Sequence, residues 1–159
     1  MRRGFTLIEV LIYVAILGIA FISLMTMFNA GAQSGVIVEA QNRLLDAERT
    51  AQAILQARIS TATSVTTPAS GSGSTLVLAS PVAAENPVTF ALSGGQITMK
   101  LGAGAAAPIT PADMRVTSFT VTRLSGSPAG VRVSLVTETD AGTLLIPGSV
   151  TFTTLLRYD

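Results

Sequence analysis

A single long apolar segment near the N-terminus constrains this chain more than any other feature. It runs from Phe5 to Phe28, follows Arg2 and Arg3, and is interrupted by one charged residue, Glu9. About 24 helical residues at a rise of ~1.5 Å per residue extend roughly 36 Å, enough to cross a hydrocarbon core of ~30 Å. Because the arginines flank the short end, we expect a cytoplasmic N-terminus and an extracytoplasmic remainder, in a single-pass protein of the inner (cytoplasmic) membrane.

The composition limits what the remainder can do. The chain has 159 residues, of which 48% are hydrophobic and 12% are charged, with a net charge of +1. This leaves room for one modest domain beside the apolar helix and gives no electrostatic sign of nucleic-acid binding. Cysteine and histidine are both absent, which removes disulfides, thiolate nucleophiles, imidazole bases and the commonest zinc ligands.

Two kinds of export signal compete for the apolar segment. A secretory signal peptide could be cut after the small residues Ala30, Gly31 and Ala32, and a twin-arginine signal would use Arg2 and Arg3. The apolar core of a signal peptide usually runs ~7–15 residues, which is shorter than this segment. Neither signal accounts for the carboxylate of Glu9.

Glu9 requires an explanation of its own, because a carboxylate inside a membrane helix costs ~2.5–3.5 kcal/mol or more. One explanation is that Glu9 lies close enough to the interface to reach water. Another follows if the chain is cut between Gly4 and Phe5. The new amine of Phe5 then lies four residues before Glu9, on the same helical face, where amine and carboxylate can neutralise each other.

The octapeptide Gly4-Phe5-Thr6-Leu7-Ile8-Glu9-Val10-Leu11 resembles the prepilin cleavage and methylation motif of type IV pilins and type II secretion pseudopilins. The similarity joins a short basic leader, a glycine at the cut, a phenylalanine after it and a glutamate at the required spacing. It covers Met1 to about Phe28, and beyond that only a general plan of long helix and β-rich domain.

The resemblance implies functions for four residues. A membrane prepilin peptidase would cut after Gly4 and methylate the amine of Phe5, and Glu9 would pair with the amine of a neighbouring subunit during assembly. We assign Thr6 to assembly together with Glu9. The implied partners are prepilin peptidase, other pilin or pseudopilin subunits, an inner-membrane assembly platform and membrane lipid.

A second helical pattern follows the apolar segment. Asn29–Gly35 is small and glycine-bearing, which can loosen the helix, and an amphipathic helix then extends to about Ala62. We place Glu48 among the charged residues on its solvated faces. The expected parts are a leader (1–4), a membrane helix (5–28), an amphipathic helix (29–63) and a β-rich head (64–159). The apolar positions of the second helix are Ile37, Ala40, Leu44, Ala51, Ile54, Leu55 and Ile59.

The head is predicted to be a small antiparallel β-sheet packed on the long helix, which makes the fold class α+β. Ser93-Gly94-Gly95 predicts one hairpin turn, and Ser125–Gly130 predicts another. We expect Arg123 and Arg132 to point outward. The predicted strands are Thr75–Ala79, Val88–Leu92, Gln96–Leu101, Val116–Leu124, Val131–Thr139 and Val150–Leu156, with Phe119, Val121, Val131, Val133 and Leu135 on the inward face.

No catalytic motif is found in the head, and we predict no enzyme activity, cofactor or metal. Glu138 and Asp140 flank a turn, where an acidic turn and a calcium site are the alternatives. The overall prediction is a minor pilin or pseudopilin of a type IV pilus-like or type II secretion filament. The alternative is an extracytoplasmic binding or enzymatic domain that the helix merely tethers.

Overall fold

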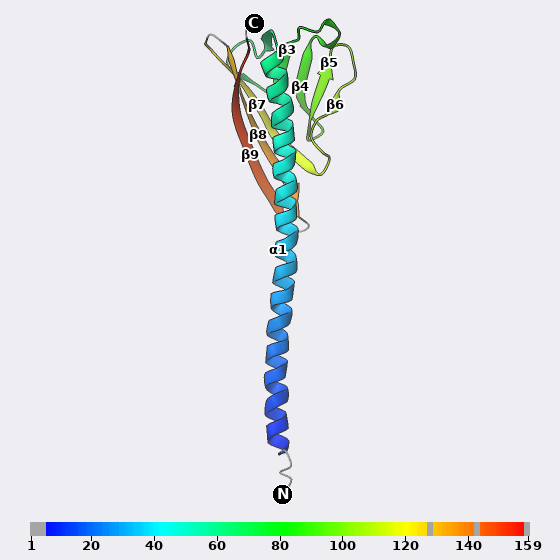
Figure 1. Cartoon of the computed structure of the whole chain (residues 1–159), viewed down its shortest axis with the longest axis vertical. Coiled ribbons are helices and arrows are strands. Elements are labelled where there is room, and N and C mark those ends of the chain that lie inside the picture. The colour runs from blue at the N-terminus through cyan, green and yellow to red at the C-terminus, as the bar shows by residue number, and fades with distance from the viewer. Residues whose placement is uncertain (1–5, 127–128, 142–143, 158–159) are drawn as a thin grey trace. The chain divides into compact units, whose positions relative to one another are not determined.

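The computed structural model describes residues 6–126, 129–141 and 144–157. Its principal elements are one long helix, α1 (Leu7–Thr61), and two antiparallel β-sheets, which confirms the predicted α+β class (Figure 1). The chain divides into two compact units, residues 1–39 and 40–159. The first unit contains the N-terminal part of α1, and the second contains the last turns of α1 and both sheets.

α1 has 55 residues and is helical through Asn29–Gly35, where the sequence suggested a looser helix. The helix ends at Thr61, one residue before the predicted end. At this end the amide of Ala62 donates to the carbonyl of Ile59. The amide of Thr63 donates to the carbonyl of Ala79 in the β-rich part of the chain that follows the helix, called the β-domain below. The chain therefore passes from the helix directly into a sheet.

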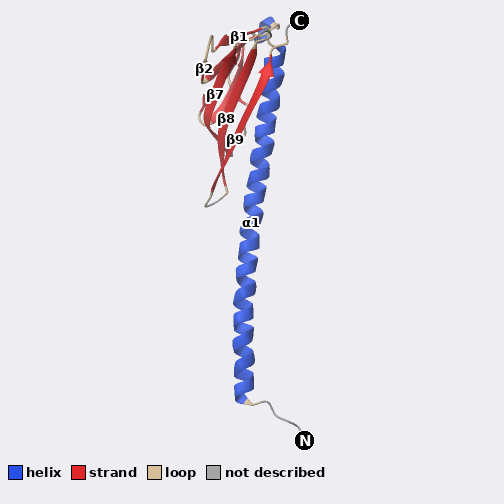
Figure 2. Ribbon diagram, turned by 90° about the vertical axis from the view of Figure 1, so that its left-hand side faces the viewer, coloured by secondary structure: helices blue, strands red, loops and turns tan. Residues whose placement is uncertain are grey.

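The second unit contains a five-stranded and a four-stranded sheet, whereas the sequence predicted one (Figures 1 and 2). The five-stranded sheet has the order β1-β3-β4-β5-β6, and the four-stranded sheet has the order β2-β7-β8-β9. The strands are β1 (Ser64–Thr67), β2 (Ser72–Gly73), β3 (Thr75–Ala79), β4 (Val88–Ser93), β5 (Gln96–Leu101), β6 (Ala107–Pro108), β7 (Met114–Leu124), β8 (Gly130–Asp140) and β9 (Leu145–Leu155), with a 3-10 turn at Ala83–Glu85.

The hairpin between β4 and β5 forms as predicted. Ser93 lies opposite Gln96, and the two residues between them, Gly94 and Gly95, have φ values of 61° and 78°. Two successive positive φ values are easily adopted by glycine, and they match the twist of the flanking strands. β7 and β8 also pair antiparallel, with a connection that lies partly outside the described residues.

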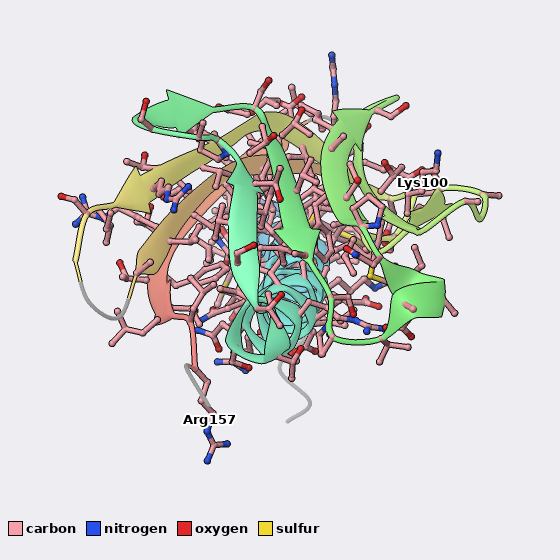
Figure 3. The ribbon with its side chains drawn as sticks, turned by 90° about the horizontal axis from the view of Figure 1, so that it is seen from above. Lys100 and Arg157 are labelled. Atoms are coloured by element: carbon pink, nitrogen blue, oxygen red, sulfur yellow. The ribbon has the colours of Figure 1, made fainter. Side chains whose placement is uncertain are left out.

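The core of the second unit lies between residues 40–61 of α1 and the sheets. Figure 3 views it from above, with the helix seen end-on in the lower half of the picture and the strands around it. One stripe of the helix is buried: Leu44, Ala51, Leu55 and Ile59 are at most 4% exposed. All five residues predicted for the inward face of β7 and β8 are buried as well. Lys100 and Arg157 extend away from this core (Figure 3).

The strand predictions are correct in location but differ at their ends. β3 and β5 have the predicted bounds, and β4, β7 and β8 differ by one or two residues. β9 begins five residues earlier than predicted and includes Pro147 and Gly148. The short strands β1, β2 and β6 were not predicted.

The outward orientation predicted for Arg123 is wrong. Arg123 has the same parity along β7 as the buried Phe119 and Val121, so its side chain starts from the inward face. Its Nη1 donates to the carbonyl of Val65 at 3.0 Å and to that of Ala69 at 3.1 Å. Arg123 therefore ties the segment after the helix to the end of β7. Arg132 is exposed, as predicted.

Candidate functional site

The N-terminal end of α1 is the candidate site. The carbonyl of Thr6 accepts hydrogen bonds from the amides of Glu9 (3.1 Å) and Val10 (3.3 Å), so Thr6 occupies the N-cap position of the helix. Thr6-Leu7-Ile8-Glu9 also has the Thr-x-x-Glu spacing of a capping box. The two residues predicted for assembly thus meet in the first helical turn, where a carboxylate is favoured by the helix dipole.

Gly4 and Phe5, the residues predicted for cleavage and methylation, lie outside the described residues. Glu9 is partly exposed, and a partner can therefore reach it from outside the chain. In the sequence Glu9 follows Phe5 by four positions. The relation between the amine of Phe5 and the carboxylate of Glu9 remains a prediction from that spacing.

The apolar surface after Glu9 is exposed on every side of the helix. Leu11 is 63% exposed, Leu17 is 69% exposed and Phe28 is 75% exposed. By length and composition this part of α1 can cross a membrane, and none of its most apolar stretch is buried within the protein. An apolar surface of this extent needs lipid or other protein around it.

Hydroxyl groups along this part of α1 bond to the helix itself. Ser23 Oγ donates to the carbonyl of Ile19 at 3.0 Å, and Thr26 Oγ1 donates to the carbonyl of Ser23 at 2.8 Å. Such bonds satisfy a hydroxyl without water, which makes these residues compatible with a lipid environment.

A second carboxylate, Glu48, is buried in the second unit. The sequence analysis placed it on a solvated face of the helix, and that prediction is wrong. Its position completes the stripe of Leu44, Ala51 and Leu55, and only 3% of it is exposed. Thr137 Oγ1 of β8 donates to Glu48 Oε1 at 2.5 Å. The repeat of buried positions every three or four residues could have revealed this location.

Gly148 of β9 provides the space for that carboxylate. A Cβ atom at Gly148 would lie 2.5 Å from Glu48 Oε1, 2.7 Å from Thr137 Oγ1 and 2.9 Å from Leu44 Cδ2. A larger residue is therefore excluded unless these neighbours move. Glu48, Thr137 and Gly148 form one buried contact between the helix and the four-stranded sheet.

Glu138 and Asp140, which the sequence placed beside a turn, lie at the end of β8, and Glu138 has a neighbouring cation. Arg115 Nη1 of β7 lies 3.3 Å from Glu138 Oε1, so one of the two candidate calcium ligands is in an ion pair. Among the described residues, no group of three acidic, histidine or cysteine side chains is placed to hold a metal ion. Arg115 also lines an open depression of about 630 Å³ next to Gly94, Gly95 and Met114.

Comparison with known families matches residues 1–25 to the prokaryotic N-terminal methylation motif. This motif marks a type IV pilin-like or pseudopilin-like protein and implies processing by prepilin peptidase. Proteins of this kind are typically structural subunits without enzyme activity. Comparisons with curated proteins and with solved structures find no significant match. The family match ends before the β-domain, so statements about the β-domain rest on its own structure.

Proposed function

We propose that the chain is a minor subunit, a pilin or pseudopilin, of a type IV pilus-like or type II secretion filament. The observation that carries this proposal is the combination of the methylation motif at residues 1–25 with a helix whose apolar surface is exposed all round. The second unit has a buried core of its own, so this apolar surface is free for lipid and for the helices of other subunits.

In this proposal, prepilin peptidase cuts after Gly4 and methylates the amine of Phe5. The leader then leaves, and α1 starts at or near its own N-cap, Thr6. The β-domain lies on the extracytoplasmic side of the inner membrane until an assembly platform adds the subunit to the filament. Glu9 pairs with the amine of a neighbouring subunit as the helices leave the bilayer, since this attraction strengthens where the effective dielectric constant is low.

The first test is the intact mass and N-terminal sequence of the chain recovered from membranes that contain a prepilin peptidase. We expect a chain that begins at N-methylated Phe5. A start at Gln33 would instead indicate a secreted protein cut by signal peptidase, and an intact Met1 would indicate a tethered domain. The variant Gly4→Leu places a bulky side chain at the cut, and we expect it to accumulate as uncleaved precursor.

A second test concerns Glu9. We expect Glu9→Leu to insert and to be cleaved normally, because the change makes the helix more apolar, but to enter filaments poorly. Incorporation is measured as the fraction of the chain found in sheared filaments against that left in membranes. Glu39→Leu, a charge removal further along α1, is the matched control. Equal incorporation of Glu9→Leu and the unaltered chain would contradict the assembly role of Glu9.

A further inference from the structure

Arg123 differs from three other arginines of the protein in having no acidic neighbour. Arg49, Arg58 and Arg115 lie next to carboxylates, at 3.8, 2.6 and 3.3 Å respectively. Arg123 forms no ion pair with a carboxylate of residues 6–126, 129–141 or 144–157, and its hydrogen-bond acceptors are neutral backbone carbonyls. Within these parts of the chain, its positive charge is therefore not neutralised by an acidic side chain.

The guanidinium group of Arg123 is held in place by the fold. Nη1 donates to the carbonyls of Val65 and Ala69, and these two acceptors account for its two hydrogens. The side chain is also partly buried. An arginine loses considerable conformational entropy when it is fixed, and here folding has already imposed that cost. A ligand that binds Arg123 does not have to immobilise it again.

Part of the guanidinium group of Arg123 keeps its hydrogen-bond donors. A guanidinium carries five N–H groups in one plane. With Nη1 occupied, the hydrogen of Nε and the two hydrogens of Nη2 have no acceptor among the described residues. The Nε–H and one Nη2–H lie parallel along one edge of the plane, and such a pair matches the two oxygens of a carboxylate. Arg123 therefore retains an edge for bidentate binding.

Arg123 lines an open depression of about 380 Å³, formed by the bend after β1 and by both ends of the connection from β7 to β8. Ser70 and Ser125 line it with hydroxyl groups, and Leu124 contributes an apolar side chain. Gly71 keeps it open, since a Cβ there would meet nothing within 4 Å. Small-molecule sites have volumes of roughly 300–1,000 Å³, so this depression has room for a small ligand.

The charge of the depression favours one negative charge on the ligand. Among the described residues that line it, Arg123 is the one cationic side chain, and none is acidic. A carboxylate brings one negative charge and two oxygens, which match one guanidinium edge. A phosphate dianion would leave one of its two charges without a cationic partner.

We propose that Arg123 and this depression bind the carboxylate group of a small ligand. The carboxylate accepts hydrogen bonds from Nε and Nη2, and the hydroxyl groups of Ser70 and Ser125 lie around the rest of the ligand. The site is formed entirely by residues of the second unit, so it is independent of cleavage at Gly4.

A carboxylate of this chain has the same chemistry as an added ligand. The amide of Leu156 donates to the carbonyl of Ala129, which lines the depression, and Asp159 follows three residues later in the sequence. Three residues span at most about 10 Å. The experiment must therefore distinguish the carboxylate of Asp159 from one supplied by another molecule.

The test titrates N-acetylglycine into the isotopically labelled full chain in uncharged detergent, at constant ionic strength, and follows the Nε–H resonances of the arginines by NMR. We expect a saturable shift at Arg123 with a millimolar Kd, and a small linear change at Arg132, which is exposed. N-acetylglycinamide, an uncharged probe of the same shape, should leave both resonances unchanged. Equal responses of Arg123 and Arg132 would show general attraction of anions and overturn the proposal.

Variants of Ser70 test the site without removing Arg123, which the fold needs for its bonds to Val65 and Ala69. Ser70→Glu places a competing carboxylate at the depression, and we expect the Kd for N-acetylglycine to rise about tenfold. Ser70→Gln is the matched control, because it has the same size without the charge, and its Kd should stay within about twofold of the unaltered value. An unchanged Kd in Ser70→Glu would contradict binding in this depression.

Asp159→Asn separates the two sources of the carboxylate. If the unaltered chain binds N-acetylglycine at Arg123, the site accepts a carboxylate from another molecule. If only Asp159→Asn binds it, the carboxylate of Asp159 occupies the site in the unaltered chain. The absence of a response at Arg123 in both chains would overturn the proposal, while N-terminal sequencing and filament incorporation test the proposed function separately.

Discussion

The two parts of α1, residues 7–39 and residues 40–61, form one helix but use their side chains in opposite ways. In the first part, large apolar residues such as Leu17 are exposed around the helix, and in the second part apolar residues such as Leu55 are buried against the sheets. Helix formation therefore does not depend on which surface an element buries. The distribution of apolar residues, all round or on one stripe, determines whether a helix serves its own core or an external environment.

The two glutamates extend this comparison. Glu9 is partly exposed in the first helical turn, where the chain offers it backbone amides and the helix dipole. Glu48 is almost fully buried, with Thr137 as a hydrogen-bond donor from β8. A carboxylate in the exposed part is available to another molecule, and one in the buried part fixes how the helix sits on the sheet.

The largest expected effect is the difference between equivalent leucine truncations in the two parts. Leu55→Ala removes a side chain that is 0% exposed, and we expect it to lower the free energy of unfolding of the β-domain by about 2–5 kcal/mol. Leu17→Ala should leave that free energy unchanged. Denaturant titration of the full chain in detergent, followed by circular dichroism, measures both. Equal effects of the two variants would break the comparison.

Methyl addition tests the same comparison in the other direction. In Gly148→Ala the new Cβ would overlap Glu48, Thr137 and Leu44. We expect this variant to lower the free energy of unfolding of the second unit by about 1–3 kcal/mol, measured by the same denaturant titration. Gly18→Ala is the matched control, because its Cβ would meet nothing within 4 Å.

A double-mutant cycle identifies the cause of that loss. In a Glu48→Ala background, the cost of Gly148→Ala should shrink without vanishing, since Thr137 Oγ1 and Leu44 Cδ2 also lie under 3 Å from the new atom. Additive effects of Glu48→Ala and Gly148→Ala would show that the Glu48 carboxylate is not the reason why position 148 requires glycine.

Ion pairs on the second part of α1 are expected to have smaller effects. Arg58 Nη1 lies 2.6 Å from Glu85 Oε2, with both side chains about one third exposed, and we expect Arg58→Ala to cost about 1 kcal/mol. Arg49 lies 3.8 Å from Asp46, with both side chains more than three quarters exposed, so Arg49→Ala should stay within about 0.5 kcal/mol. Thermal unfolding of the two variants compares these losses of stability. A larger loss of stability from Arg49→Ala than from Arg58→Ala would contradict the prediction that the partly buried ion pair contributes more.

The sequence predicted the helix and most strands well because their signals are local. The spacing of Leu44, Ala51, Leu55 and Ile59 indicates a buried stripe without knowledge of the partner sheet. The location of Glu48 was not predicted, because a charged residue is read as solvated unless its buried partner, here Thr137 in a distant strand, is known. The donors for a buried polar group come from tertiary structure.

The ends of strands and the second sheet were missed for related reasons. The beginning of β9 was not predicted because Pro147 and Gly148 both weaken a strand signal. In the structure Pro147 is tolerated because β9 is the outer strand of its sheet, and Gly148 leaves space for the carboxylate of Glu48. The candidate site at Thr6 and Glu9 could be recognised because it is a contiguous motif. In the proposed function its partner is the amine of a neighbouring chain, so that contact belongs to the assembly and not to the fold of one chain.

The last comparison concerns hydroxyl groups. Ser23 and Thr26 in the exposed part of α1 bond to helix carbonyls, whereas Thr154 Oγ1 of β9 is buried without a hydrogen-bond partner among the described residues. Thr154→Val replaces this hydroxyl by a methyl group of similar size and should raise the free energy of unfolding by up to about 1 kcal/mol. Thr137→Val should lower it, because Glu48 then loses its donor. Opposite signs in unfolding titrations of these variants would show that the partner, and not burial alone, decides what a hydroxyl contributes; equal signs would refute it.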